Sequence, residues 1–236
     1  MEPSESKMPK HIGIILDGNR RFAKQLMMKP WKGHEFGAKK IWDLFDWCKD
    51  LGLHEVTLYT FSIENFKRPK EEFEYLMQLF TKEFKAVKKD QRVHKNRIRI
   101  NFIGRIKMFP KPVYNAMQEL MEATKEYGNY IVNFAMAYGG RAEIIDATKK
   151  IAKKIKEGNL DVSKINEEVF SKELYLESEP DLIIRTSGEQ RTSGFLIWQG
   201  AYAELYWCEK KWPEFEKGDL IAAIEDYMLR ERRFGK

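Results

Sequence analysis

Residues 11–21, HIGIILDGNRR, place a carboxylate and two guanidinium groups directly after an apolar run. The apolar run predicts a buried strand, and the following RFAKQLMM can form a helix whose first N–H groups favour an anion. Gly18 allows the sharp turn between them, and Arg20 and Arg21 are bidentate donors suited to phosphate. Because Mg²⁺ bridges carboxylate and phosphate oxygens, Asp17 predicts a magnesium-assisted phosphate site. The alternative is a helix cap followed by a surface basic pair.

The rest of the chain alternates apolar strands with helices. We expect strands at 12–16, 55–62, 98–104, 130–138, 181–186 and 195–199, and helices at 33–52, 70–89, 112–127, 141–156, 163–174 and 217–231. This order predicts an α/β fold with a central, mainly parallel β-sheet flanked by helices on both faces. We expect residues 1–10 to be a flexible N-terminal segment and residues 11–236 to be a single catalytic domain.

Polar residues follow several of these strands. Open parallel sheets bind ligands outside the carboxyl ends of their strands. Asp17, residues 62–68, residues 139–141 and Arg185 all follow strands, so we expect them on one rim. Arg185 and Arg191 frame the turn TSGEQ, whose backbone N–H groups can form an anion-binding nest. Two separated arginine groups predict two phosphate-bearing ligands, although Arg185 can instead form a salt bridge at a strand end.

The expected helices 70–89 and 112–127 carry more apolar side chains than a single core stripe requires. Such a surface is most often core. It can instead line an apolar cleft between the sheet and the helices, with Phe80, Met117 or Leu120 limiting its length. A phosphate rim in front of an apolar cleft suits an isoprenoid diphosphate.

Composition limits the remaining classes. The net charge of +6 suits an anionic substrate, a nucleic acid or an acidic membrane surface. The sequence has no P-loop, no dinucleotide fingerprint and no zinc-binding spacing. Cys48 and Cys208 predict buried reduced thiols, and we see neither a signal peptide nor a membrane span. We therefore expect a cytoplasmic protein whose contact with membranes is peripheral.

Several motifs together resemble the cis-prenyltransferases, the undecaprenyl and dehydrodolichyl diphosphate synthase type. They are HIGIILDGNRRFAK, TLYTFSIENFKRP, NFAMAYGGR, DLIIRTSGEQRTSGFLIWQGAYAELYW and RERRFG. The resemblance implies condensation of isopentenyl diphosphate onto an allylic diphosphate, farnesyl or geranylgeranyl. The product would be a long-chain polyprenyl diphosphate for lipid-carrier synthesis. It also implies Mg²⁺ as cofactor, a homodimer, and membrane contact through the product.

The resemblance assigns roles by position. Asp17 would bind Mg²⁺ and help the allylic diphosphate leave, and Asn65 would abstract or position the transferred proton. Substrate binding would fall to Gly18, Asn19, Arg20, Arg21, Phe22, His34, Ser62, Glu64, Phe66, Arg68, Arg185, Arg191, Thr192, Ser193, Arg233 and Gly235. Glu204 would be a Mg²⁺ ligand for the partner chain, and the C-terminal R-x-G would reach the other subunit's site.

The sequence departs from the family pattern at two positions. Pro30 stands where the family often has arginine, so we expect Lys29 or Lys32 to supply that charge, and Gly194 replaces an asparagine. A non-catalytic subunit of a heteromeric enzyme is an alternative, but such a subunit would be expected to lose the DGN and SxEN residues that are intact here. A nucleic-acid-binding protein fits the charge but not arginines concentrated at strand ends, so we expect no nucleic-acid partner.

Overall fold

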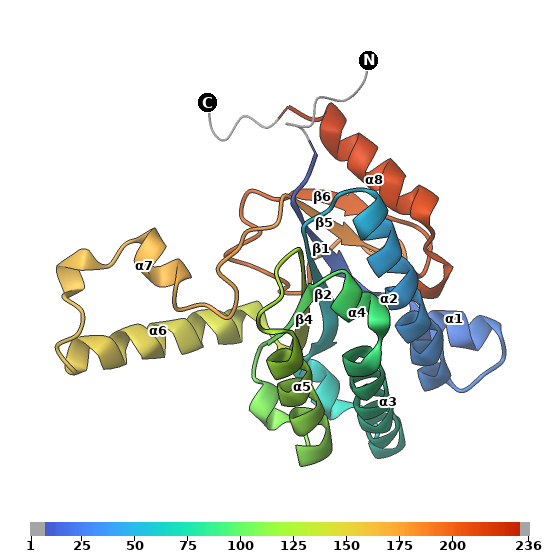
Figure 1. Ribbon diagram of the computed structural model, residues 1–236, viewed down its shortest axis with the longest axis horizontal. Helices are drawn as coiled ribbons and strands as arrows, with labels where there is room; N and C mark the ends of the chain where they lie inside the picture. The colour runs from blue at the N-terminus through green and yellow to red at the C-terminus, as the bar shows by residue number, and fades with distance from the viewer. Residues whose placement is uncertain (1–7, 232–236) are drawn as a thin grey trace.

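The computed structural model describes residues 8–231 (Figure 1). Residues 1–7 of the expected N-terminal segment lie outside the described residues, as do Arg233 and Gly235. The last part of that segment packs on the domain: Met8 contacts the core, and the backbone N–H of Lys10 donates to the Asp181 carboxylate at 2.8 Å.

Six strands form one sheet in the order β3-β4-β2-β1-β5-β6, and every pair is parallel. The strands are β1 His11–Ile15, β2 Glu55–Ser62, β3 Ile98–Ile103, β4 Tyr130–Tyr138, β5 Leu182–Arg185 and β6 Glu204–Trp207. The predicted α/β class with a parallel sheet is confirmed. Because all strands point the same way, their carboxyl ends share one edge.

The helices are α1 Asn19–Gln25, α2 Gly33–Asp50, α3 Lys70–Lys89, α4 Gln91–Lys95, α5 Lys111–Thr124, α6 Gly140–Lys156, α7 Glu167–Ser171 and α8 Lys217–Leu229, with 3₁₀ turns η2 Pro30–Lys32, η3 Ile63–Lys67, η4 Ile106–Met108, η5 Val162–Lys164 and η6 Trp212–Glu214. Helices α2, α3, α5 and α8 bury their apolar residues against one face of the sheet in a single core. Side chains alternate along each strand, so Ile12 and Ile14 of β1 enter this core while Ile15 points to the other face.

The second face is covered differently from the expected helical layer. Its core consists of Ile15, Ile103, Ala135, Tyr138, Ile183, Phe195 and Leu196. Two of these come from the predicted strand 195–199, which is wrong: these residues form turns, and Leu196 has φ 44°, a left-handed backbone that no strand adopts. The run is apolar because it is buried as a turn, with the Phe195 ring stacked 4.9 Å from that of Tyr59. The sixth strand is instead β6, paired with β5.

The continuous helix predicted over 163–174 is also wrong. The chain forms η5 and the five-residue α7, each opened by its own side-chain cap. Asp161 accepts the Ser163 N–H at 2.8 Å, and Asn166 accepts the Val169 N–H at 2.9 Å. Two caps five residues apart divide the segment, because a capping residue takes an extended backbone that interrupts a helix. Figure 1 shows α6 projecting away from the sheet toward α7.

Candidate active site

A cleft of about 420 Å³ opens at the carboxyl edge of the sheet, between the strands and helices α2 and α3. Its polar lining contains nine of the predicted site residues: Asp17, Asn19, His34, Ser62, Glu64, Asn65, Arg68, Arg185 and Ser193. Its apolar lining includes Ile41 and, from α3 and β4, Leu79, Phe80, Phe84 and Phe134. The arrangement offers a charged mouth and an apolar interior, as expected for an amphiphilic ligand. Met117 and Leu120 are fully buried in the core and do not line this cleft.

Asp17 and Arg185 meet at the mouth of the cleft. The strand register sets Ile15 of β1 opposite Arg185 of β5, which brings the Arg185 guanidinium to 2.7 Å from Asp17 Oδ2. The other carboxylate oxygen accepts the Gly18 N–H at 2.6 Å and lies 3.3 Å from Arg21. Burial of Asp17 acts to raise its pKa, but the hydrogen bond and charge of Arg185, with Arg21 and Gly18, hold the pKa below its ordinary value. The carboxylate is therefore ionised at neutral pH.

Arg185 also organises the following loop. Its guanidinium donates to Ser193 Oγ at 2.9 Å and to the backbone carbonyl of Arg191. Its Nε is buried without a hydrogen-bond partner, an arrangement that costs free energy unless a ligand supplies an acceptor. Thr186, the next residue, is fully buried and donates its hydroxyl to the Asp17 carbonyl at 2.7 Å. The loop after β5 and the turn after β1 are thus joined directly.

Two N–H groups of the turn TSGEQ, the predicted anion-binding nest, are already used within the protein. Ser187 and Gly188 do adopt left-handed backbone, with φ 78° and 72°. However, their N–H groups donate to the carbonyls of Lys210 and Cys208 at 2.7 and 2.9 Å. Those donors anchor the turn to the chain after β6 and are not available to a ligand.

A second cationic cluster surrounds a buried carboxylate, Glu72 in the first turn of α3. Glu72 is 1% exposed and lies 3.2 Å from Arg68 and 3.6 Å from Arg20. Arg68 also lies 3.3 Å from Nε2 of His34. Burial, with the charges of Arg68 and Arg20, lowers the His34 pKa to about 3, so its imidazole is neutral at physiological pH. Four segments, α1, α2, η3 and α3, meet here.

Asn65 lies in η3, directly after β2, and its amide is fixed by the backbone. Its Oδ1 accepts the Ser62 N–H at 3.1 Å, which leaves the amide NH₂ as the group able to contact a ligand in the cleft. Phe66 is not part of the cleft lining, and its ring centre lies 5.1 Å from that of Phe61 and 5.2 Å from that of Phe109. This aromatic packing holds η3 against the core.

Some predicted site residues lie outside the cleft lining. Arg21 and Arg191 both pair with Glu189, and Phe22 packs edge-on against Phe36. Gly18, Arg20 and Thr192 are also outside the lining and adjoin residues within it. Glu204 lies at the amino end of β6, opposite Leu182, where it pairs with Arg230 at 2.7 Å. Within one chain, Glu204 is thus at the end of the sheet away from Asp17.

The two lysines expected to compensate for Pro30 face carboxylates instead. Lys29 pairs with Glu71 at 2.8 Å, and Lys32 pairs with Glu35 at 3.2 Å while lying over the Tyr75 ring. Neither lines the cleft.

Sequence reasoning missed two residues that shape the mouth. Glu72 looked like an ordinary acid in a helix first turn, and Trp212 lay outside every motif considered. The Trp212 N–H donates to the Asp17 carbonyl, and its indole donates to the Gly37 carbonyl, both at 2.9 Å. The glycine at position 37 is the one sequence feature that points to this contact, because any other residue would place a Cβ 2.2 Å from Asn19 Oδ1. That oxygen is buried with no partner, a second unpaired polar atom at the cleft.

Two further properties concern metals and membranes. Across residues 8–231 no three acidic, histidine or cysteine side chains gather as a metal site. In the same part of the chain no helix has the length and apolar character needed to cross a bilayer. Cys48 and Cys208 are free and buried, as predicted.

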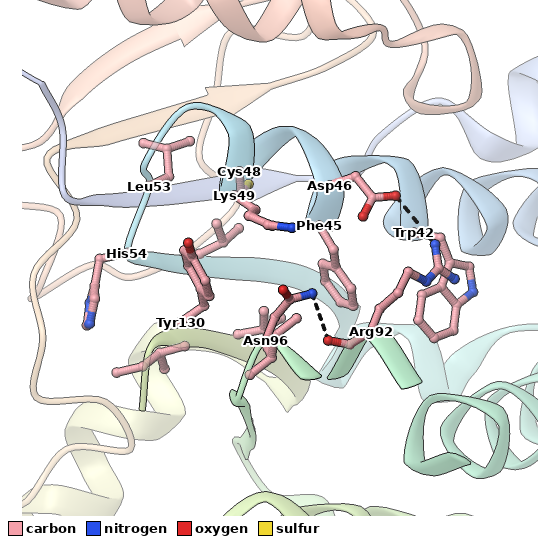
Figure 2. Close-up of a pocket in the computed structure, with 14 residues that line it drawn as sticks. Trp42, Phe45, Asp46, Cys48, Lys49, Leu53, His54, Arg92, Asn96 and Tyr130 are labelled. Atoms are coloured by element: carbon pink, nitrogen blue, oxygen red, sulfur yellow. Dashed lines mark hydrogen bonds and ion pairs between the residues drawn. The ribbon is translucent and has the colours of Figure 1, made fainter. Parts of the chain in front are cut away.

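A second pocket lies at the opposite, amino-terminal edge of the strands (Figure 2). It is lined by apolar residues such as Phe45, Leu53 and Tyr130, and Arg92 closes it, with its guanidinium 4.5 Å from the Trp42 ring centre. Its volume of about 20 Å³ is close to that of one water-sized probe. The carboxyl-edge cleft is the candidate active site because it brings the predicted site residues together.

The chain has close relatives of known class. The family model for putative undecaprenyl diphosphate synthase matches residues 15–235. The geranylgeranyl-diphosphate-specific tritrans,polycis-undecaprenyl-diphosphate synthase of Methanopyrus kandleri is 48% identical over 98% of this chain and 86% of its own length. The isoprenyl transferase of Thermus thermophilus is 44% identical over 100% of this chain and 92% of its own.

A solved structure agrees with these sequence relatives. Lavandulyl diphosphate synthase from Lavandula x intermedia, crystallised with dimethylallyl diphosphate, superposes with a TM-score of 0.91 at 31% identity, covering 98% of this chain and 100% of that one. The dimethylallyl diphosphate in that complex is an allylic diphosphate, the type of ligand that a charged mouth and an apolar interior suit. The chain belongs to the cis-prenyltransferase (undecaprenyl diphosphate synthase) family and is a cis-type polyprenyl diphosphate synthase.

Proposed function

We propose that this enzyme elongates geranylgeranyl diphosphate with isopentenyl diphosphate to a polyprenyl diphosphate of undecaprenyl type. The observation that carries the proposal is the single cleft with Asp17, Arg68 and Arg185 at its mouth and α3 phenylalanines inside. The Methanopyrus relative, specific for geranylgeranyl diphosphate, supports this choice of starter.

The two cationic clusters suit two diphosphates. We assign the allylic diphosphate to the side formed by Asn19, Arg20, His34 and Arg68. His34 lies on α2, whose Ala38 and Ile41 line the cleft, and the Arg68 guanidinium lies 6.0 Å from the ring centre of Phe61, another lining residue. The isopentenyl diphosphate is assigned to the side formed by Arg185, Arg191 and Ser193. Neutral His34 can donate one hydrogen bond while its Nε2 faces Arg68. The unpaired Arg185 Nε–H, a donor, lies on the isopentenyl side and can bond to a diphosphate oxygen there.

The residues at the mouth fit a magnesium–diphosphate complex. Mg²⁺ is commonly held by one or two carboxylates together with substrate phosphates. Asp17 is such a carboxylate, kept ionised by its cationic neighbours, and Glu204 of a partner chain is the second candidate ligand. When bound, Mg²⁺ would neutralise charge that develops on the departing diphosphate.

The condensation makes and breaks three bonds. The C–O bond to the allylic diphosphate breaks with its electron pair leaving on pyrophosphate, the C4 alkene carbon of isopentenyl diphosphate bonds to the allylic carbon, and a proton from C2 passes to the released pyrophosphate. The arginines stabilise the departing oxygen. Because Asn65 Oδ1 already accepts the Ser62 N–H, and an amide is a poor base, we assign Asn65 to positioning through its NH₂ group.

The starter assignment is tested with radiolabelled isopentenyl diphosphate, Mg²⁺ and a series of allylic diphosphates from dimethylallyl to geranylgeranyl. We expect the highest kcat/KM with geranylgeranyl diphosphate and no incorporation after chelation of divalent cations. Thin-layer chromatography of the products identifies their length. Preference for farnesyl diphosphate would contradict the starter, and no incorporation with any starter would contradict the activity.

Product length is expected to depend on Phe80. Its ring lines the cleft between those of Phe61 and Phe84, so Phe80→Ala opens the interior and should lengthen the products. Met117→Ala is the matched control, because Met117 is buried in the core outside the cleft. We expect it to lose about 2–5 kcal/mol of stability with unchanged products. Identical product ladders from Phe80→Ala and the parent would return Phe80 to a purely structural role.

We also propose a homodimer in which each C-terminal tail completes the neighbouring site. Deleting residues 232–236 should lower turnover by about 10-fold or more, the scale of a lost charged contact to a reacting diphosphate. Mixing this truncated chain with an Asp17→Ala chain should restore part of the activity, because one site of the heterodimer then has both elements. A mixture that stays inactive after demonstrated subunit exchange contradicts action across the interface.

A further inference from the structure

The connection after α1 exposes three large apolar side chains in succession. Leu26, Met27 and Met28 are 48%, 96% and 37% exposed, and all six residues from Lys24 to Lys29 are exposed. We call this segment, residues 24–29, the α1 tip. In Figure 1 the connection after α1 stands at the edge of the molecule, beside α2. Apolar side chains clustered at a projecting point are typical of a contact surface.

The backbone of the α1 tip holds these side chains outward. The Met28 N–H donates to the Ala23 carbonyl and the Met27 N–H to that of Lys24, the paired bonds of a Schellman helix end. Met27 occupies the left-handed position of this motif, with φ 55°, where glycine is the usual residue. The chain therefore presents a long apolar side chain at a position where a residue without one would be more stable.

The sequence around the α1 tip is rich in cations, because residues 18–34 contain five lysines and arginines and no acidic residue. Four of them pair with carboxylates from elsewhere in the chain: Arg20 with Glu72, Arg21 with Asp17 and Glu189, Lys29 with Glu71, and Lys32 with Glu35. Lys24, next to the apolar side chains, is exposed on α1 and supplies the positive charge of the tip. Apolar side chains flanked by cations are the combination by which proteins bind the interface of anionic lipid bilayers.

We propose that the α1 tip docks this enzyme on an anionic lipid bilayer by inserting Leu26, Met27 and Met28 among the lipids. A stable protein interface buries about 1,200–2,000 Å², far more than three side chains on a convex tip provide, whereas a bilayer accommodates a small projecting wedge. This reading rests on the proposed function in one respect, since a polyprenyl product belongs in a bilayer. The tip leads through η2 into α2, whose His34, Ala38 and Ile41 line the cleft, so docking places the cleft beside the membrane.

Insertion is tested directly with a fluorophore sensitive to polarity attached at Met27→Cys. Labelling is selective because Cys48 and Cys208 are buried, and burial raises the pKa of the Cys48 thiol to about 12. We expect increased, blue-shifted emission with vesicles of equal parts phosphatidylcholine and phosphatidylglycerol. The same label at Met108→Cys, an exposed methionine on η4, should not respond. No response at position 27, or an equal response at both positions, overturns the proposal.

Co-sedimentation of unlabelled variants with the same vesicles measures how much Leu26, Met27 and Lys24 contribute to membrane binding. The double variant Leu26→Ser, Met27→Ser should lower partitioning by about 10-fold or more, and Met108→Ser should not change it. Lys24→Gln should lower it about 5-fold on the anionic vesicles and little on phosphatidylcholine alone. Unchanged partitioning of the double variant overturns the proposal. So does a change in its sedimentation without lipid, which would show a contact between two copies. Because no turnover is measured, these results are independent of the isopentenyl incorporation assay that tests the proposed function.

Discussion

Replacing Asp17 by asparagine is expected to lower the rate of isopentenyl condensation by about 1000-fold. Loss of one electrostatic stabiliser typically costs about 100- to 1000-fold, and loss of a metal ligand adds to it. Asparagine has nearly the same shape and keeps an oxygen for the Gly18 N–H or for Arg185, which both contact Asp17 in the parent. The measurement is single-turnover incorporation of labelled isopentenyl diphosphate with saturating Mg²⁺ and starter.

The fold of this variant serves as its control. Asp17 lies at the cleft mouth, and its backbone is held by Thr186 and Trp212 independently of the carboxylate. We therefore expect a circular dichroism spectrum and a Tm close to those of the parent, with Asp17→Ala showing the same loss of activity. Turnover within tenfold of the parent in a folded variant would show that the Asp17 carboxylate has no essential role in the reaction.

Much of the fold followed from local patterns in the sequence. Five of the six predicted strands, including the buried run before Asp17, correspond to observed strands, because each is a short apolar segment between turn residues. The exception, 195–199, shows the limit of that signal. Burial of Phe195 and Leu196 produces the same apolar pattern whether the backbone is a strand or a turn, and only the backbone itself, with φ 44° at Leu196, distinguishes them.

The site was predictable to the extent that it follows strand ends. The rim rule placed Asp17 and Arg185 together, and the register of β1 on β5 brings them to 2.7 Å. The salt bridge considered as the structural alternative for Arg185 is thus present, and its partner is the proposed metal ligand. Glu72 and Trp212 could not be found this way, since their roles depend on how α1, α2 and η6 pack. Availability of the Ser187 and Gly188 N–H groups likewise depends on the carbonyls of Lys210 and Cys208, which lie after β6.

Replacing Arg185 by glutamine is expected to affect both halves of the site at once. Arg185 is 4% exposed and contacts Asp17, Ser193 and the Arg191 carbonyl, a set that glutamine cannot reproduce. Breaking a buried ion pair typically costs about 3–5 kcal/mol, and we expect less here because the Asp17 side chain is 29% exposed. Turnover should fall about 100-fold or more, with a raised KM for isopentenyl diphosphate. Urea unfolding and steady-state kinetics give the two quantities.

Arg185→Gln should also change how activity depends on pH in the acid range. In the parent, burial raises the Asp17 pKa, but Arg185, with Arg21 and Gly18, lowers it below the ordinary value. Ionised Asp17 therefore contributes stability that is present above its unfolded pKa and is lost as the pH falls through the lower folded pKa. Without Arg185, burial is less opposed and the Asp17 pKa rises, so the acid limb of the activity profile should move to higher pH.

Arg185→Lys keeps a positive charge beside Asp17 but loses the forked contacts to Ser193 and Arg191, so it should retain the parent's acid limb while still raising KM. An acid limb that is the same in the glutamine variant as in the parent would show that Arg185 does not control Asp17 ionisation.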